Sequence, residues 1–196
     1  MDGAPRGTSE YTSIVQQKGS GIRGTLRAVE EIHGERTVAA IMARLPPEAR
    51  RSLQPMILAS AWYPIESIAA VHVGIRDVVG KGSWSAAHDL AMTAARHDFT
   101  GIHAAFMRAL TLDAVWSRIA DAWGHYHTQG RVHLADRAPT SARVIIDQVE
   151  GFNEGLWNAV AGRSQVLLEL VGARGAIAEA HRPSPTSAQI DMEWLS

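Results

Sequence analysis

The hydrophobic period of this 196-residue chain changes near Gly130, and this change constrains the fold more than any other feature. Before it, apolar residues recur every three to four positions, which is typical of helices that bury one side. After it, apolar and polar residues alternate, most clearly over residues 189–194, where every second residue is apolar. This order predicts helices first and antiparallel strands second, and therefore an α+β fold.

Breaks at Pro and Gly divide the first 130 residues into short predicted helices. Pro46 ends one helix and Pro47 can begin the next, because a proline in the first turn leaves no N–H to satisfy. Ser83 and Thr111 precede apolar stripes and are predicted N-caps. The predicted helices cover about residues 22–34, 38–45, 65–79, 84–94 and 112–126. Residues 1–20 lack a period, so we expect a mobile arm followed by one domain over 21–196.

The last third of the chain is predicted to form two hairpins with a helix between them. Residues 131–136 and 143–149 have the composition of strands, joined by a loop that contains Pro139. A long helix follows over 153–171, and a strand over 176–181 pairs with the one over 189–194. The predicted fold is α+β, in the order helices, hairpin, helix, hairpin, with the helices packed on a small four-stranded antiparallel sheet.

Charge and cysteine content exclude several classes of function. The 19 Lys and Arg residues nearly balance 20 Asp and Glu residues, so the chain offers no strong field for nucleic-acid phosphates. The absence of cysteine excludes disulfides, thiolate catalysis and thiolate zinc sites. No apolar run approaches the roughly 20 residues that a membrane span needs, and the first residues do not read as a secretory signal. We expect a cytoplasmic protein without a nucleic-acid partner or a membrane span.

The sequence holds no motif of a familiar catalytic chemistry. The stretch from Gly74 to Gly82 has five residues between its first two glycines and no Ser or Thr after Lys81, so it does not match a phosphate loop. Ser164 lacks the second glycine of a nucleophile elbow, and no His-Glu-x-x-His is present. We therefore predict that the protein is not an enzyme, and we assign it no cofactor.

Nine histidines leave a metal or haem site as an alternative. His125 and His127 lie at the predicted end of a helix, where side chains two positions apart diverge by about 200°. We interpret this pair as a solvent-facing helix end rather than a chelating pair. His97 and His103 lie near apolar residues and could form an acid–base or haem-ligating group, with a helix junction of satisfied side chains as the preferred interpretation.

Large aromatic residues give the better functional lead. Trp62, Tyr63 and Pro64 form a rigid extended corner before a long helix, and further aromatic residues lie on the helix before the sheet. Core filling is the default role of such residues, and the alternative is a pocket for a flat ligand or a partner surface. The candidate ligand-binding residues are Trp62, Tyr63, His72, His103, Phe106, Trp123 and Tyr126.

Several stretches of the sequence resemble a family of uncharacterised myxobacterial paralogues of similar length. The Trp62-Tyr63-Pro64 corner is the most specific part of this resemblance. The likeness covers about residues 20–196 and is carried by residues 43–51, 59–66, 94–103, 122–132, 170–175 and 191–194. That family is similar to the ligand-binding superfamily that contains 4-vinyl-reductase domains, haem–nitric-oxide-binding domains and TRAPP trafficking subunits.

The resemblance implies helices on a four-stranded sheet, a pocket for a small molecule or lipid between them, and homodimerisation. The sequence departs from the superfamily in two places. Ala180, Pro183 and Ala188 lie in the region where 4-vinyl-reductase domains carry cysteines. The Tyr-x-Ser-x-Arg signature of haem-based nitric oxide sensors is absent after Tyr126, although His103 would be the first candidate axial ligand.

Three functions remain as hypotheses. The first is a bacterial sensory or adaptor domain that binds a hydrophobic small molecule or a protein partner and works as a homodimer. The second is a pure protein-interaction module, a regulator or scaffold of bacterial signalling whose aromatic residues pack inside. An exposed apolar patch without a pocket would favour this second function. The third is a histidine-metal or haem protein.

Overall fold

The protein is described by a computed structural model that covers residues 14–100, 105 and 107–196. Its helices come mostly from the N-terminal part of the chain, as the hydrophobic period predicts. They are α1 (Gly19–His33), α2 (Glu35–Ala43), α3 (Pro47–Ser52), α4 (Ile65–Val78), α5 (Ser85–Asp98), α7 (Leu112–Trp116), α8 (Ile119–Tyr126) and α9 (Glu154–Leu170). The strands are β1 (Gln16–Lys18), β2 (Trp62–Pro64), β3 (Arg131–Ala138), β4 (Ser141–Asp147), β5 (Ile177–Ser184) and β6 (Ser187–Glu193).

The strands form a two-stranded sheet of β1 and β2 and a four-stranded sheet in the order β3-β4-β6-β5. All neighbours in the larger sheet are antiparallel, and its two hairpins, β3-β4 and β5-β6, meet along β4 and β6. Helix α9 connects the hairpins, so the predicted order of helices, hairpin, helix and hairpin is confirmed. The α+β fold follows from the sequence periods alone.

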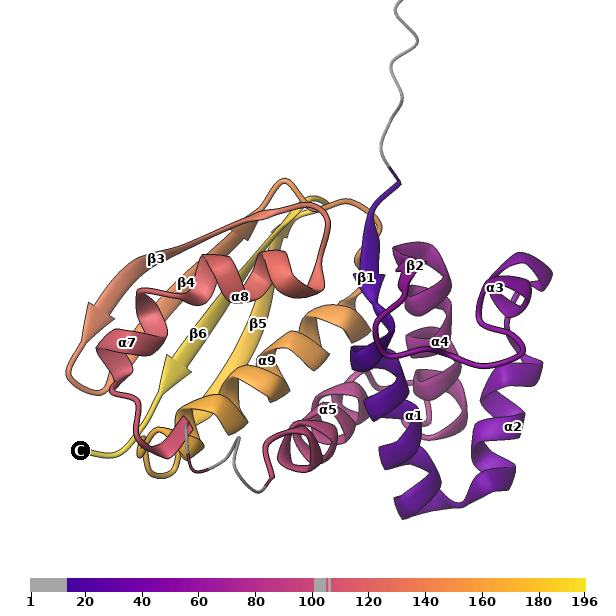
Figure 1. Ribbon diagram of the computed structural model, residues 1–196, viewed down its shortest axis with the longest axis horizontal. Coiled ribbons are helices and arrows are strands. Elements are labelled where there is room, and N and C mark those ends of the chain that lie inside the picture. Colours follow the sequence, from indigo (N-terminus) through magenta and orange to yellow (C-terminus); the bar gives the residue numbers. More distant parts are fainter. Residues whose placement is uncertain (1–13, 101–104, 106) are drawn as a thin grey trace, which may run out of the picture.

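One face of the larger sheet is covered by helices (Figure 1). Helix α9 packs against β5 and β6, and α8 packs against β3. Strands β4 and β6 alternate between buried and more exposed residues, because successive side chains of a strand point to opposite faces. The covered face contributes Val144, Ile146, Ile190 and Met192 to the core. The other face carries polar side chains.

The N-terminal helices form a second layer that packs on α9. Helix α5 lies along α9 over most of its length, and α1 packs against α5 (Figure 1). Strand β1 joins this layer to the sheet layer. Its Gln16 N–H donates to the Thr128 hydroxyl at 2.9 Å, and the Thr128 N–H donates to the Gln16 carbonyl at 3.0 Å.

Local differences from the predicted elements have simple physical reasons. Strand β1 and the start of α1 occupy positions 16–20, inside the predicted arm, because β1 pairs with β2. The predicted helix over 112–126 is split into α7 and α8, with Arg118 in a non-helical conformation at the start of α8. Thr111 is the expected N-cap of α7 and accepts from the Ala114 N–H, whereas Ser83 lies one position before the N-cap of α5. No helix in the described ranges is long and apolar enough to cross a membrane.

Gly162 sets how closely α9 approaches α5. A methyl group at this position would run into the backbone carbonyl oxygen of His88, which cannot move without moving α5. We therefore expect Gly162→Ala to lower the free energy of unfolding by about 1–3 kcal/mol. Gly124→Ala is the matched control, because its added methyl group meets nothing within 4 Å and a helical Ala is favoured by about 1 kcal/mol. Urea unfolding measures both, and an equal effect of the two changes would contradict this account.

Candidate functional site

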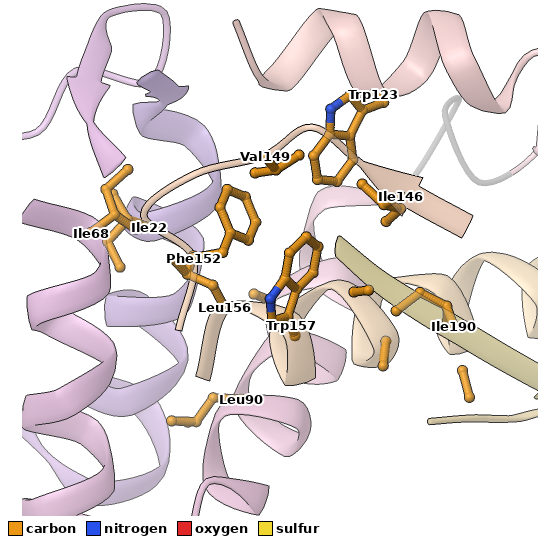
Figure 2. Close-up of a cluster of buried hydrophobic side chains, with 14 of the residues drawn as sticks. Ile22, Ile68, Leu90, Trp123, Ile146, Val149, Phe152, Leu156, Trp157 and Ile190 are labelled. Atoms are coloured by element: carbon orange, nitrogen blue, oxygen red, sulfur yellow. The ribbon is translucent and has the colours of Figure 1, made fainter. Parts of the chain in front are cut away.

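An aromatic cluster fills the space between α8, the start of α9 and the sheet. It consists of Trp123, His127, Phe152 and Trp157. The rings of Trp123 and His127 are stacked with centroids 3.8 Å apart, and those of Phe152 and Trp157 are 4.4 Å apart. Trp123 and Trp157 lie nearly parallel at 6.5 Å. Figure 2 shows Trp123 and Phe152 pointing toward Trp157 from two sides.

The chain positions each ring of this cluster by a local device. The Trp123 indole N–H donates to the Gln129 carbonyl at 2.8 Å, which fixes the ring at the end of α8. Gly130 has φ +107° and lies against Trp123 and Val149, so a side chain at this position would be both strained and crowded. Asn153 caps α9 by accepting from the Leu156 N–H at 3.0 Å, and this cap places Phe152 just before the helix.

Several polar atoms inside and beside the cluster have no hydrogen-bond partner among the described residues. His127 is 8% exposed, and neither of its ring nitrogens has one. The indole N–H of Trp157, a residue 1% exposed, is also unpartnered. Each buried polar group without a partner costs about 1–3 kcal/mol, and such groups are uncommon in native proteins. Among the described residues, His127 is the one side chain with two buried atoms that lack a partner.

Burial lowers the pKa of both interior histidines to about 4. For His127 the desolvation of the imidazolium is the main cause. The Trp123 backbone acts in the opposite direction without reaching hydrogen-bond geometry to either ring nitrogen, and the positive charge of Arg163 lowers the pKa further. For His72 the main cause is again desolvation, with the positive charge of Arg163 as a second one. Both imidazoles are therefore neutral at pH 7, and each offers one donor and one acceptor nitrogen.

His72 lies away from the ring stack, on α4 where it faces α9. Its Nδ1 is buried without a partner among the described residues. A methyl group at Gly155 of α9 would come within 2.7 Å of the His72 Cβ and 2.9 Å of the Trp84 ring, so these residues are tightly packed. His72 is therefore a packed core histidine that adds a second neutral imidazole to the interior.

The remaining predicted site residues separate into interior and surface positions. Trp123 belongs to the aromatic cluster, and Tyr63 is buried with its hydroxyl accepting from the Leu58 N–H at 2.8 Å. Trp62 is 38% exposed, because it precedes Tyr63 in β2 and so points to the other side of the strand. Tyr126 is 43% exposed. His103 and Phe106 lie outside the described residues.

Lys18 connects the two exposed aromatic residues. Its ammonium lies 5.4 Å from the centre of the Trp62 ring and 3.3 Å from His125 Nε2. The His125 ring in turn contacts Tyr126 edge-on at 5.1 Å. We call Lys18, Trp62, His125 and Tyr126 the aromatic surface cluster. The predicted ligand-binding residues thus do not form one group, since Trp62 and Tyr126 lie here and Trp123 lies inside.

The interpretation of His125 and His127 as a solvent-facing pair is wrong for His127. Helix α8 ends at Tyr126, and His127 has the extended conformation φ −132°, ψ 143°. This conformation lets it form a bridge with Gln17 of β1, and its ring packs against Trp123 and Phe152. His97 Nε2 lies 3.0 Å from the Glu31 carboxylate on α1, and its side chain is partly exposed. In the described ranges no group of three or more His, Asp or Glu residues could hold a metal ion.

Phe152, Trp157 and the burial of His127 were missed by sequence reasoning. Trp157 lay in the predicted helix over 153–171 without an assigned role, and Phe152 lay in the segment just before it. The signal that could have found them is the asparagine N-cap at Asn153, which sets Phe152 outside the helix and leaves Trp157 one turn inside. No sequence signal predicts the bridge between β1 and His127, because it joins Gln17 to a residue 110 positions away.

Comparison with known proteins supports the fold. Neither protein-family models nor characterised proteins give a match. Among solved structures, the chain is similar to an Fe(II) unliganded H-NOX protein from K. algicida, with a TM-score of 0.63 and 14% identity over 91% of this chain and 97% of that one. It is also similar to a mutant of T. tengcongensis H-NOX, with a TM-score of 0.60 and 7% identity over 91% and 98%.

A third similar structure is an oxygen-binding H-NOX domain related to soluble guanylate cyclases, with a TM-score of 0.61 and 7% identity over 91% of this chain and 95% of that one. At these identities the likeness shows the fold alone. The sequence-based resemblance to a superfamily that includes haem–nitric-oxide-binding domains is thus supported at the level of an H-NOX-like architecture over about 91% of the chain.

The similarity to H-NOX structures raises the question of whether this chain binds haem. The described residues do not fit a haem group. The space between helices and sheet, where the resemblance places a pocket, is filled by the aromatic cluster with ring centroids 3.8–6.5 Å apart. A flat macrocycle would have to displace Trp123 and Trp157 from the core. Neutral His72 and His127 have the chemistry of iron ligands, but neither faces a slot of porphyrin size among the described side chains.

Proposed function

We propose that this chain is a non-catalytic sensory or adaptor domain that binds a small, flat, mainly hydrophobic molecule at the aromatic cluster. The H-NOX-like fold supports a sensory role. The observation that carries the ligand assignment is His127, which is buried against Trp123 with both ring nitrogens unpartnered among the described residues. The absence of a catalytic motif from the sequence agrees with a binding role.

The chemistry of the cluster defines the ligand class. The faces of Trp123, Phe152 and Trp157 favour an aromatic ring, since such rings stack or pack edge-on with centroids about 4.5–7 Å apart. Neutral His127 offers one donor and one acceptor, so the favoured ligand carries an acceptor and a donor of its own, such as a ring amide. Binding would give the orphan nitrogens partners and remove a cost of about 1–3 kcal/mol for each.

A ligand of this class must take the place of a ring–ring contact, because the cluster is closed in the described arrangement. Opening the stack between Trp123 and His127 requires movement at the end of α8, where β1 is bridged to His127. Binding inside the cluster would therefore shift β1 and the helical layer that β1 joins to the sheet. This coupling is the physical basis of the proposed sensory role.

A protein-interaction module is the second candidate function, and the aromatic surface cluster favours it. Trp62 and Tyr126 are exposed around Lys18. Leu58 is also exposed and belongs to the loop that donates its N–H to Tyr63. Exposed apolar groups of this kind mark protein contact sites when they are contiguous. We further propose that the protein acts as a homodimer, as its resemblance implies.

The ligand proposal is tested on the freshly purified full chain by native mass spectrometry and by thermal-shift titration with 2-pyridone. This probe is flat and carries one N–H donor and one carbonyl acceptor. Benzene is the matched probe without polar atoms. We expect either a copurified mass or a shift with 2-pyridone that exceeds the shift with benzene. The same native spectrum reports whether the protein is a dimer.

His127→Phe and His125→Phe form the matched pair of variants for this test. His127→Phe keeps an aromatic ring but removes both orphan nitrogens, so the affinity for 2-pyridone should fall at least about tenfold. His125→Phe changes the exposed neighbour and should leave it unchanged. A chain that copurifies with no ligand and binds neither probe would overturn the ligand assignment. Equal affinities of the two variants for 2-pyridone would overturn it as well. Either result would favour the protein-interaction function.

A further inference from the structure

The open face of the four-stranded sheet is strongly acidic. Alternation places on it every second residue of β4 and β6, counted from Arg143 and Asp191, and the register adds their partners on β3 and β5. The charged residues of this face are Arg131, Asp136, Arg143, Asp147, Glu179, Asp191 and Glu193, accompanied by His133 and His181. This face thus carries five carboxylates and two guanidinium groups. Its formal charge is −3 with both histidines neutral, whereas the whole chain carries −1.

One of the two positive charges is already neutralised within the face. The Arg143 Nε donates to Asp191 Oδ1 at 2.7 Å, and the Gln189 amide donates to Asp191 Oδ2 at 2.6 Å. Burial acts to raise the pKa of Asp191, but these two hydrogen bonds and the Arg143 charge hold it below its ordinary value, so this carboxylate is ionised. In contrast, Glu179 and Glu193 take part in no ion pair within the described residues.

A hollow of about 320 Å³ lies on the same face, at the end of the sheet where β4 begins and β6 ends. Its wall includes Asp136 from β3, Glu179 from β5 and Glu193 from β6, which surround the Arg143–Asp191 pair. At the edge of the face, Ile177 is 58% exposed and is the register partner of Glu193. The face therefore combines a concave acidic region with an exposed apolar side chain beside it.

The negative charge of this face indicates which kind of partner can bind to it. A second copy of the chain that packs through the same face would bring the same negative charge to the same place and be repelled. A metal ion lacks a suitable group of three or more ligands in the described ranges. A segment with two or more Lys or Arg side chains complements both the free carboxylates and the apolar rim, because basic side chains combine a charged end with an apolar stem.

We propose that the open sheet face is the docking surface for a basic segment of a partner protein, with Glu179 and Glu193 as its main contacts. This inference is independent of the ligand proposed for the aromatic cluster, since the two sites lie on opposite faces of the sheet. It assigns to the proposed sensory or adaptor domain a surface through which a partner engages it. Arg143 and Asp191 hold the shape of the surface, and the exposed carboxylates provide the attraction.

The test is binding of a labelled nine-residue peptide of alternating Arg and Leu to the full chain, followed by fluorescence anisotropy. A peptide of alternating Glu and Leu is the control probe. We expect the basic probe to bind, with an affinity that falls at least about tenfold between 50 mM and 500 mM salt, and the acidic probe not to bind. Binding of both probes with equal affinity would overturn the proposal.

The matched variants remove two negative charges each. Glu179→Gln with Glu193→Gln should weaken the basic probe about five- to tenfold. Glu30→Gln with Glu48→Gln makes the same charge change at exposed positions of α1 and α3 and should change the affinity less than twofold. An equal loss in both double variants would show general charge attraction and overturn the assignment. Loss of a dimer in the Glu179–Glu193 variant would overturn it in favour of a second copy as occupant.

Discussion

Replacing Trp157 with Ala should lower the free energy of unfolding by about 3–5 kcal/mol, the range for a large buried aromatic residue. Trp157 is 1% exposed and contacts Phe152 and Trp123, so its loss leaves a cavity at the junction of the helices and the sheet. Figure 2 shows Trp157 projecting from α9 toward the rings of Trp123 and Phe152, which would have to move to fill that space. Urea unfolding followed by far-UV circular dichroism measures the change.

Two further tryptophan variants test whether the destabilisation comes from the loss of the buried ring of Trp157. Trp157→Phe keeps most of the ring and removes the indole N–H that has no partner among the described residues, so it should destabilise by less than half as much as Trp157→Ala. Trp62→Ala removes a side chain that is 38% exposed and should cost less than about 1.5 kcal/mol. Similar losses for Trp157→Ala and Trp62→Ala would contradict the position of the aromatic cluster in the core.

Acidification between pH 6.5 and pH 4 should destabilise the protein by up to about 3 kcal/mol for each of its two interior histidines. The pKa of His72 and of His127 is lowered from 6.5 to about 4 in the folded protein, chiefly by burial. The unfolded chain therefore binds these protons first as the pH falls. Stability is complete above pH 6.5 and decreases steadily down to about pH 4, where the folded protein also takes up the protons.

Urea midpoints at pH 7.0, 5.5 and 4.5 measure this dependence, and histidine variants assign it. His72→Phe with His127→Phe should have a flatter pH profile than the natural chain, whatever its absolute stability. His97→Phe with His125→Phe changes two more exposed histidines and should keep the steep profile. The carboxylate of Asp191 does not interfere, because its pKa is lowered and its contribution is lost only at more acidic pH. A profile that is unchanged in the His72–His127 variant would contradict the burial of neutral imidazoles.

The two proposed sites share the sheet as a common wall. Ile146 and Ile190 pack toward the aromatic cluster from the covered face (Figure 2). The register places Arg143 and Asp191 on the open face of the same two strands. A ring displaced by a ligand would contact strands whose other side holds the acidic surface. Binding of 2-pyridone and of the basic peptide can be measured together, and their coupling would be reciprocal.

The type of each element and the face it buries were readable from the amino-acid sequence. The helical period before Gly130 and the alternation at 189–194 predict the α+β order, because element type and buried face depend on local spacing along the chain. The N-cap at Thr111 was likewise readable, since a cap depends on residues within one turn. For the candidate site, the same local reasoning selected Trp123 and Tyr63 as important aromatic residues.

Which rings meet and which histidine is buried became clear only from the packing of the elements. Trp123 and Trp157 lie on different helices that are separated in the chain by a whole hairpin, so no local period relates them. His127 is buried because α8 ends one residue earlier and β1, from the far end of the chain, forms a bridge to it. The acidic surface arises in the same way, since Glu179, Asp191 and Arg143 become neighbours only through strand pairing. Contacts between distant segments depend on how the layers pack, and spacing along the sequence does not encode that packing.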